Sequence, residues 1–169
     1  MKVYGVIGWK NSGKTGLMER LITEIRRRGL SVSSIKHAHH AFDIDRPGKD
    51  SFRHRQAGAG EVLLASRHRW VLMHENGPDQ EPPLSELLAR LSPVDLVLVE
   101  GYKRDDHPKI EAHRAATGQP LIGPEEATVR AVASDVPAAL SAQGWQGAGF
   151  DLDDTAGLAD FILTDLGLR

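Results

Sequence analysis

Short apolar runs alternate along the chain with stretches whose apolar residues recur at helical spacing. This pattern predicts strands at residues 3–7, 30–36, 95–101, 109–113 and 129–133, the last being the final clear strand. It predicts helices at residues 17–28, 84–91 and 155–166, and a short helix from residue 50 or 51 to residue 57. Alternation of strand and helix favours a three-layer α/β fold built on a mainly parallel sheet.

Two further strand-like runs, 61–65 and 69–74, are separated only by Ser66, Arg67 and His68. A connection this short joins antiparallel strands, so we expect an antiparallel pair beside the parallel sheet. A chain of 169 residues is most simply one domain, and we expect residues 1–169 to form it.

Composition narrows the class of protein. The formal net charge of −2 gives no global signature of a nucleic-acid or membrane binder. No stretch approaches the ~20 apolar residues of a membrane span, and the N-terminus leads directly into the first strand without the regions of a signal peptide. The absence of cysteine excludes disulfides and thiolate metal sites, and it is typical of a cytoplasmic protein.

The first strand is followed by Gly8-Trp9-Lys10-Asn11-Ser12-Gly13-Lys14-Thr15, a complete G-x-x-x-x-G-K-[ST] sequence placed between a strand and a helix. Backbone N–H groups of such a loop bind phosphate oxygens, and the following helix N-terminus favours their negative charge. The candidate nucleotide-binding residues are Gly8, Lys10, Asn11, Ser12, Gly13, Lys14, Thr15 and Gly16. Lys14 is expected on the β- and γ-phosphates, and the Thr15 hydroxyl on Mg²⁺.

Carboxylates stand at both ends of the apolar run 95–101, as Asp95 and Glu100. Five strand residues separate them by roughly 16 Å, so both cannot reach one metal ion. Ligands bind beyond the carboxyl ends of parallel strands, where the first strand delivers the phosphate loop. We therefore choose Glu100 as the acidic partner of Mg²⁺, directly or through water. If a bound triphosphate is hydrolysed, we expect Lys14, Thr15 and Glu100 to position the in-line attack by electrostatics.

Several segments together carry a resemblance to a known family. They are the loop Gly8 to Thr15, the run Lys36-His37-Ala38-His39-His40, the segment Phe42 to Ser51 with its Asp-x-Asp-x-Pro-Gly-Lys-Asp-Ser pattern, the turn Ala57-Gly58-Ala59 and the strand end Val99 to Lys103. In this order and spacing they resemble the molybdopterin-guanine dinucleotide biosynthesis adaptor family. The segment Asp43 to Ser51 is the most specific of them.

The resemblance implies a GTP-binding adaptor with weak, Mg²⁺-dependent GTPase activity, and a P-loop nucleoside-triphosphatase fold. It also implies a homodimer that assists the guanylyltransferase joining GMP to molybdenum-bound molybdopterin, with molybdopterin as a further ligand. The edge of the antiparallel pair at residues 61–74 is where a second chain could pair.

Other residues leave alternatives open. Asp135, just after the run 129–133, could accept hydrogens from guanine, or it could be an ordinary loop Asp, since Ala131 and Val132 stand where Asn and Lys are usual. The imidazoles of His37, His39 and His40 could contact a ligand or hold a metal, which would suit a metal-delivery GTPase. A small-molecule kinase with lid arginines at Arg53, Arg55 and Arg67 is the other alternative. In the segment 43–51, Asp43, Asp45 and Lys49 could position Mg²⁺ or a phosphate ligand, or Asp50 could simply cap a helix.

Overall fold

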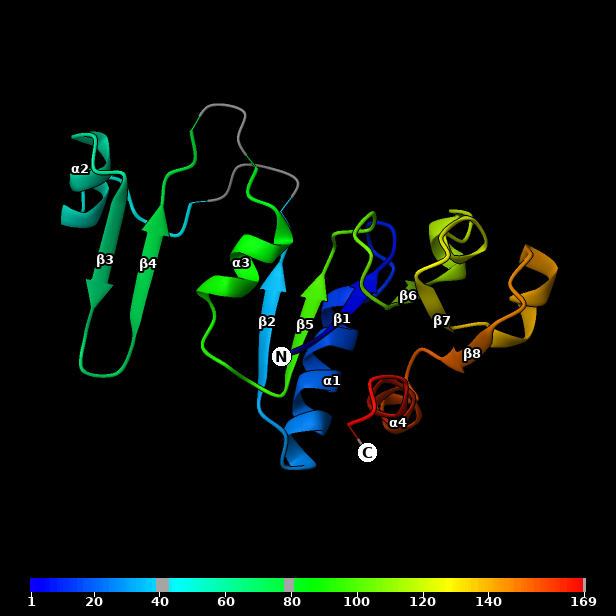
Figure 1. Ribbon diagram of the computed structural model, residues 1–169. Coiled ribbons are helices and arrows are strands. Elements are labelled where there is room, and N and C mark those ends of the chain that lie inside the picture. The colour runs from blue at the N-terminus through cyan, green and yellow to red at the C-terminus, as the bar shows by residue number, and fades with distance from the viewer. Residues whose placement is uncertain (39–42, 78–80, 169) are drawn as a thin grey trace. The chain divides into compact units, whose positions relative to one another are not determined.

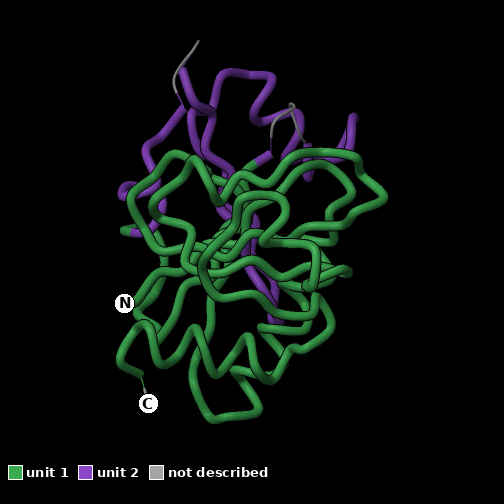
Figure 2. The backbone as a smooth tube through the Cα atoms, turned by 90° about the vertical axis from the view of Figure 1, so that its right-hand side faces the viewer, with its two compact units in different colours: residues 1–37, 89–169 green, residues 38–88 purple. Residues whose placement is uncertain are grey.

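The computed structural model describes residues 1–38, 43–77 and 81–168, and its chain separates into two compact units (Figure 1). The first unit comprises residues 1–37 and 89–169, and the second comprises residues 38–88 (Figure 2). No described helix has the length and apolar character that crossing a membrane demands. The prediction of one domain over residues 1–169 stays a prediction.

The first unit is built on a six-stranded sheet in the order β2-β5-β1-β6-β7-β8, in which every neighbouring pair is parallel (Figure 1). The strands are β1 (Lys2–Ile7), β2 (Val32–Lys36), β5 (Leu96–Glu100), β6 (Lys109–His113), β7 (Val129–Ser134) and β8 (Ala148–Asp151). The helices around them are α1 (Lys14–Arg27) and α4 (Thr155–Asp165), and α3 (Leu84–Arg90) spans the boundary of the two units. This mainly parallel α/β architecture is the predicted fold class.

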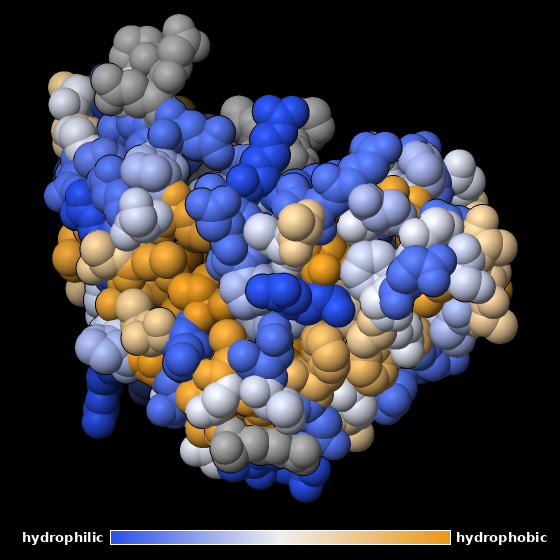
Figure 3. All heavy atoms as spheres, turned by 45° about the vertical axis from the view of Figure 1, so that its right-hand side comes forward, coloured by the Kyte–Doolittle hydropathy of each residue, from blue (hydrophilic) through white to orange (hydrophobic). Residues whose placement is uncertain are grey.

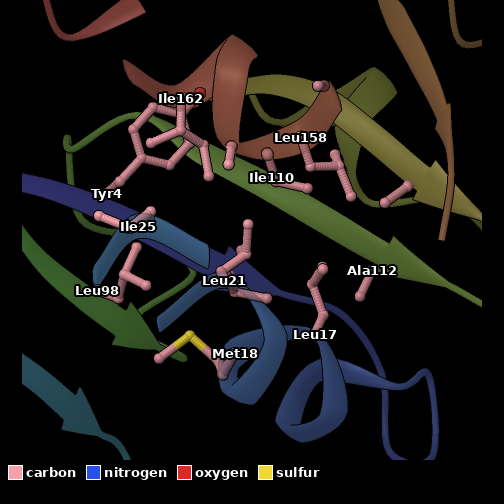
Figure 4. Close-up of a cluster of buried hydrophobic side chains, with 14 of the residues drawn as sticks. Tyr4, Leu17, Met18, Leu21, Ile25, Leu98, Ile110, Ala112, Leu158 and Ile162 are labelled. Carbon is pink, nitrogen blue, oxygen red and sulfur yellow. The ribbon is translucent and has the colours of Figure 1, made fainter. Parts of the chain in front are cut away.

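Side chains alternate across the sheet and build a core on each face. On one face, α1 and α4 pack against Tyr4, Val6, Leu98 and Ile110, all of them fully buried (Figure 4). On the other face, the intervening residue Ile7 packs with a smaller cluster of apolar side chains, consisting of Leu121, Val129, Val132 and Leu140. Of these residues, Ile7 belongs to β1, and Val129 and Val132 belong to β7. Leu121 and Leu140 come from the irregular segments that contain the 3₁₀ turns Gly123–Glu125, Pro137–Ala139 and Ser141–Gln143. All five residues of β5 are buried, so both of its faces are covered, which agrees with its apolar run Leu96 to Val99.

The elements agree with the sequence pattern except in three places. Strand β8 lies beyond the run 129–133, so that run is not the last strand; its sequence Ala-Gly-Phe-Asp offers only one strong strand former. Helix α1 begins at Lys14, three residues before the predicted start, because the phosphate loop turns directly into it. Gly29 lies just beyond the end of α1 and has a left-handed backbone, with φ of 88°, as is common where a helix ends.

The second unit contains α2 (Asp50–Gln56) and the antiparallel hairpin β3–β4, formed by Glu61–Ala65 and Trp70–His74. Here the third difference appears: α2 has Lys49 at its N-cap with no side-chain capping bond, and Asp50 is the first helical residue. The suggestion that Asp50 caps this helix was therefore wrong. The predicted antiparallel pair is confirmed, with Leu63 directly opposite Leu72.

Arg55 of α2 holds the segment that begins at Asp43. Its guanidinium donates to Asp43 at 2.9 Å and to Glu75 at 2.9 Å, and Asp45 lies 3.4 Å away. Asp45 also accepts a hydrogen bond from the Ser51 hydroxyl at 2.8 Å. These contacts give the acidic side chains of the segment a structural task within the second unit, and they engage one of the three arginines considered for a kinase lid.

Apolar side chains remain at the surface of the hairpin β3–β4. In register, Leu63 and Leu72 share a face with Trp70, and they are 60%, 39% and 67% exposed. The face drawn in Figure 3 carries both hydrophilic and hydrophobic residues, and the hydrophobic ones gather in patches. An isolated two-stranded sheet is only marginally stable in water, and clustered apolar residues exposed on such a sheet are typical of an interaction surface.

Candidate phosphate-binding site

The candidate site lies at the carboxyl edge of β2, β5 and β1, where three strands end at the same level. Val6 is in register with Glu100, and Glu100 is in register with Lys36. The loop Gly8 to Gly13 leaves β1 at this edge and enters α1. The order of the strands therefore brings Glu100 to the phosphate loop, as the edge rule for parallel sheets predicts.

The phosphate loop adopts backbone conformations that its glycines permit. The φ angles of Gly8, Asn11 and Gly13 are 146°, 66° and 95°, all in the left-handed region. A Cβ atom on Gly8 would also lie 2.3 Å from the carbonyl oxygen of Ala112 and 2.5 Å from Ser12 Oγ. Gly8 is thus required both by its backbone conformation and by the close approach of β6.

An open depression of about 410 Å³ lies along the loop and the start of α1. It is lined by Asn11, Gly13, Lys14, Thr15, Gly16 and Arg114. The sequence predicted the first five of these residues and missed Arg114. Among the remaining predicted residues, Gly8 and Ser12 are buried within the loop and Lys10 is exposed. Because its side chain is buried, Ser12 can contribute only its backbone to a ligand.

Thr15 and Glu100 meet as the predicted metal ligands would. Glu100 lies on the same face of β5 as Leu96 and Leu98, which is the face that α1 covers. Its Oε1 accepts a hydrogen bond from Thr15 Oγ1 at 3.3 Å, and the Lys36 ammonium lies 3.5 Å from it. By contrast, Asp95 accepts hydrogen bonds from Ser31 at the opposite end of the strand.

The oxygens of Thr15 and Glu100 fit Mg²⁺. This ion takes hard oxygen ligands at about 2.1 Å in octahedral geometry, so two adjacent ligands are roughly 3 Å apart. The observed 3.3 Å separation is close to that requirement. One or two protein oxygens together with substrate phosphates form the usual Mg²⁺ site of nucleotide-binding proteins.

Lys14 belongs to a cluster of cations around one carboxylate. Burial lowers the pKa of the Lys14 ammonium, Glu100 opposes this effect, and the nearby charges of Lys103 and Lys36 lower the pKa further. The Lys14 ammonium donates to the carbonyl of Trp9 at 2.6 Å, within its own loop. A cluster with more positive than negative charge favours a polyanionic ligand.

Trp9 ties the phosphate loop to the segment that follows β6. Its indole N–H donates to the Pro120 carbonyl at 2.7 Å, and the Lys103 ammonium lies 4.2 Å from the centre of its ring. The same segment donates two hydrogen bonds to the buried Glu111 carboxylate of β6, from the N–H groups of Ile122 and Gly123 at 2.9 and 2.8 Å. The buried position of Glu111 could not be predicted from the sequence pattern, because its partners are backbone groups of an irregular segment.

Burial raises the pKa of the Glu111 carboxyl, although its two backbone donors act in the opposite direction. Because this side chain is fully enclosed, it anchors the segment and cannot contact a ligand.

Asp135 does not stand alone at the edge of the sheet. Its Oδ1 accepts a hydrogen bond from the backbone N–H of Ala115 at 2.9 Å. One oxygen of the carboxylate proposed for guanine recognition is therefore already engaged by the chain. The neighbouring residue Ser134 is hydrogen-bonded through its hydroxyl to His113 Nδ1 at 2.9 Å, so β6 and β7 are joined twice at their ends.

His37 packs at the end of β2 against Tyr102, with ring centres 4.7 Å apart. A Cβ atom on Gly101 would lie 2.8 Å from the Cβ of His37, so glycine permits this close packing. His39 and His40 lie outside the described residues. Within the described ranges, no three His, Asp or Glu side chains converge in a metal-binding group.

Comparisons with known proteins show which family this chain is similar to. The family model "Molybdopterin guanine dinucleotide synthesis protein B" matches residues 3–135. The molybdopterin-guanine dinucleotide biosynthesis adapter proteins of Escherichia coli and Haemophilus influenzae are 42% and 40% identical to this chain. The alignments cover 92% and 94% of this chain, and 87% and 85% of those proteins.

Among solved structures, the crystal structure of Bacillus subtilis MobB is similar, with a TM-score of 0.72 and 27% identity. The alignment covers 98% of both chains. The sequence resemblance is thereby confirmed over most of the chain, and the chain belongs to the molybdopterin guanine dinucleotide synthesis protein B family.

Proposed function

We propose that the chain is a GTP-binding adapter of molybdopterin guanine dinucleotide biosynthesis with weak, Mg²⁺-dependent GTPase activity. The observation that carries the nucleotide part is that Lys14 and Thr15 line one open depression, and that the Thr15 hydroxyl meets Glu100. The adapter role follows from family membership and from the printed names of the relatives.

The residues present suit binding better than rapid hydrolysis. Backbone N–H groups of the loop would bind the α- and β-phosphates, and Lys14 would bind the β- and γ-phosphates. Mg²⁺, held by Thr15 and Glu100, would neutralise the charge of the β- and γ-phosphates. No glutamine among the residues that line the depression can orient an attacking water, which supports a slow reaction.

Guanine selection is the part of the proposal that depends least on the loop. Asp135 was chosen because a carboxylate can accept both N–H groups of the guanine edge. Its Oδ1 already accepts from the Ala115 N–H, so a guanine bound here would have to share that oxygen with the backbone. We therefore propose GTP as the ligand from family membership, without assigning the base to Asp135.

The test of the nucleotide proposal is isothermal titration calorimetry with GTP and ATP in the presence of Mg²⁺, together with a measurement of phosphate release. We expect tighter binding of GTP than of ATP, and slow release of phosphate from GTP. Equal or tighter binding of ATP would reject the guanine assignment, and failure of both nucleotides to bind would reject the nucleotide proposal.

The partners proposed for the chain are the molybdopterin guanylyltransferase, molybdopterin itself and a second copy of the chain. The exposed apolar face of the hairpin β3–β4 supports the homodimer, because Leu63, Trp70 and Leu72 expose large apolar surfaces on it. Changing Trp70 to Ser should shift the protein to a monomer in analytical ultracentrifugation. An unchanged sedimentation coefficient, at the same concentration, would exclude this face from the dimer contact.

A pull-down with the guanylyltransferase tests the adapter role. We expect the two proteins to co-purify, and we expect the transferase to form more molybdopterin guanine dinucleotide when this chain is added. A transferase that neither binds this chain nor responds to it would contradict the adapter proposal while leaving nucleotide binding intact.

A further inference from the structure

Arg114 lines the depression but was not among the residues predicted from the sequence. It follows the last residue of β6, a strand that lies directly beside β1, so it reaches the same edge as the phosphate loop. A Cβ atom placed on Gly13 would lie 3.0 Å from its Nε and 3.6 Å from its Nη2. The guanidinium therefore lies against the backbone whose N–H groups face the phosphates.

The guanidinium is also available for an anion. Within residues 1–38, 43–77 and 81–168, no carboxylate forms an ion pair with Arg114, and the residue is exposed where it lines the depression. Its planar fork of N–H donors matches phosphate oxygens and stays charged at every physiological pH. The residue thus has the chemistry and the position to bind a phosphate.

The backbone that carries Arg114 is fixed on both sides by β7. On one side, His113 Nδ1 is hydrogen-bonded to the buried Ser134 hydroxyl at 2.9 Å. On the other side, the Ala115 N–H donates to Asp135 Oδ1 at 2.9 Å. The Arg114 carbonyl further accepts from the Thr117 N–H at 3.0 Å, which closes the short 3₁₀ turn. These bonds fix the backbone position from which the Arg114 side chain reaches the depression.

We propose that Arg114 binds the phosphate chain of the nucleotide directly, and that Asp135 is a positioning residue that holds Arg114 in place through the Ala115 N–H. This inference rests on the proposed nucleotide binding and deepens it. It gives Asp135 a role that does not depend on the identity of the base.

The geometry also explains the requirement at Gly13 in a second way. Its φ of 95° already favours glycine, and any side chain there would enter the space that the Arg114 guanidinium occupies. Gly13 thus lets Arg114, which follows β6, approach the loop closely.

The test of Arg114 uses a ligand that has no base. Calorimetry with GTP and with inorganic tripolyphosphate is carried out on the full chain, on Arg114→Ala and on the control Arg130→Ala, whose exposed side chain lies near the other end of β7. We expect Arg114→Ala to weaken both ligands by about 10- to 100-fold, the usual loss for a charge-assisted hydrogen bond, and Arg130→Ala to change neither.

Equal affinities of the parent chain and Arg114→Ala would overturn the inference. If the parent chain itself binds neither ligand, the nucleotide proposal fails instead, so the two failures are distinguishable. Circular dichroism on each variant shows whether it is folded, and Arg114→Lys, which keeps the charge and loses the fork, should recover part of the affinity.

The test of Asp135 compares two substitutions. Asp135→Asn keeps an acceptor for the Ala115 N–H, so it should retain the affinity for tripolyphosphate and the ratio of GTP to ATP affinity. Asp135→Ala should weaken GTP, ATP and tripolyphosphate alike, by about 3- to 10-fold, because Arg114 is no longer held. A selective loss of GTP affinity in Asp135→Asn would overturn the positioning role and return Asp135 to the guanine base.

Discussion

Replacing Glu100 by Gln removes the negative charge from the candidate metal site while preserving the shape of the side chain. Glu100 lies 3.3 Å from the Thr15 hydroxyl and 3.5 Å from the Lys36 ammonium. At an effective dielectric constant of about 20, the pair with Lys36 would contribute at most ~5 kcal/mol. Because the Lys36 side chain is 62% exposed, screening reduces this to about 1 kcal/mol, so Glu100→Gln should fold.

The effect of the same substitution on Mg²⁺ is larger. A carboxylate that holds the ion through a water molecule, at about 4 Å, contributes roughly 2 kcal/mol even at the dielectric constant of bulk water. Direct contact at about 2.1 Å would contribute roughly 4 kcal/mol by the same relation, before dehydration of the ion. We therefore expect Glu100→Gln to lower the enhancement of GTP affinity by Mg²⁺ at least ~30-fold.

The assay measures the GTP dissociation constant twice for each protein, once with saturating Mg²⁺ and once with EDTA. The ratio of the two constants is the enhancement. Asp95→Asn is the matched control, because Asp95 flanks the same strand at its other end, where it accepts hydrogen bonds from Ser31. The control should keep the enhancement of the parent chain. An enhancement that changes less than about 3-fold in Glu100→Gln would refute the assignment of Glu100 to the metal.

Two further predictions concern the fold that supports the site. Gly8→Ala should lower the free energy of unfolding in urea by about 3 kcal/mol, because its Cβ would meet the rigid carbonyl of Ala112; Gly29→Ala, with φ of 88° and open space around it, should cost only about 1 kcal/mol. Burial lowers the pKa of His107 from 6.5 to about 4, so stability is full above pH 6.5 and falls as the pH drops towards 4. The shift corresponds to a loss of at most ~3 kcal/mol in the free energy of unfolding, and partial exposure of the side chain reduces this to about 1–2 kcal/mol. His107→Gln should remove this pH dependence of unfolding. If the variant keeps the same slope of unfolding free energy against pH, His107 is not its source.

The predictable part of the site is the part that local sequence specifies. The phosphate loop is one uninterrupted segment, and its context of strand and helix could be recognised in the chain on either side. Glu100 followed from a rule about the ends of parallel strands, and the observed register with Val6 shows that the two strands are neighbours. The length of the strand showed that Asp95 and Glu100 cannot reach the same ion, and the same rule about strand ends then excluded Asp95.

The unpredicted part depends on strand order and on backbone partners. Glu111 lies in β6 and Arg114 directly follows it. A sequence does not show that β6 lies beside β1, or that Glu111 would meet the N–H groups of Ile122 and Gly123. A basic residue directly after a predicted strand was the available signal for Arg114. It becomes informative only once that strand is placed beside the phosphate loop.

The segment Asp43 to Ser51 was the most specific sign of the family in the sequence. In the structure, two of its acidic side chains form hydrogen bonds within the second unit. Asp43 and Asp45 contact Arg55, and Asp45 also accepts from Ser51. A sequence pattern can therefore identify a family through residues that hold a loop together.

The central claim is that the loop Gly8 to Thr15 binds the phosphates of GTP through Lys14. Calorimetric titration of GTP with Mg²⁺ into the parent chain, Lys14→Ala and the control Lys2→Ala tests it most directly, since Lys2 is exposed at the other end of β1. The account predicts binding by the parent chain and by Lys2→Ala, and a loss of at least ~100-fold in Lys14→Ala. Unaltered GTP affinity in Lys14→Ala would contradict it.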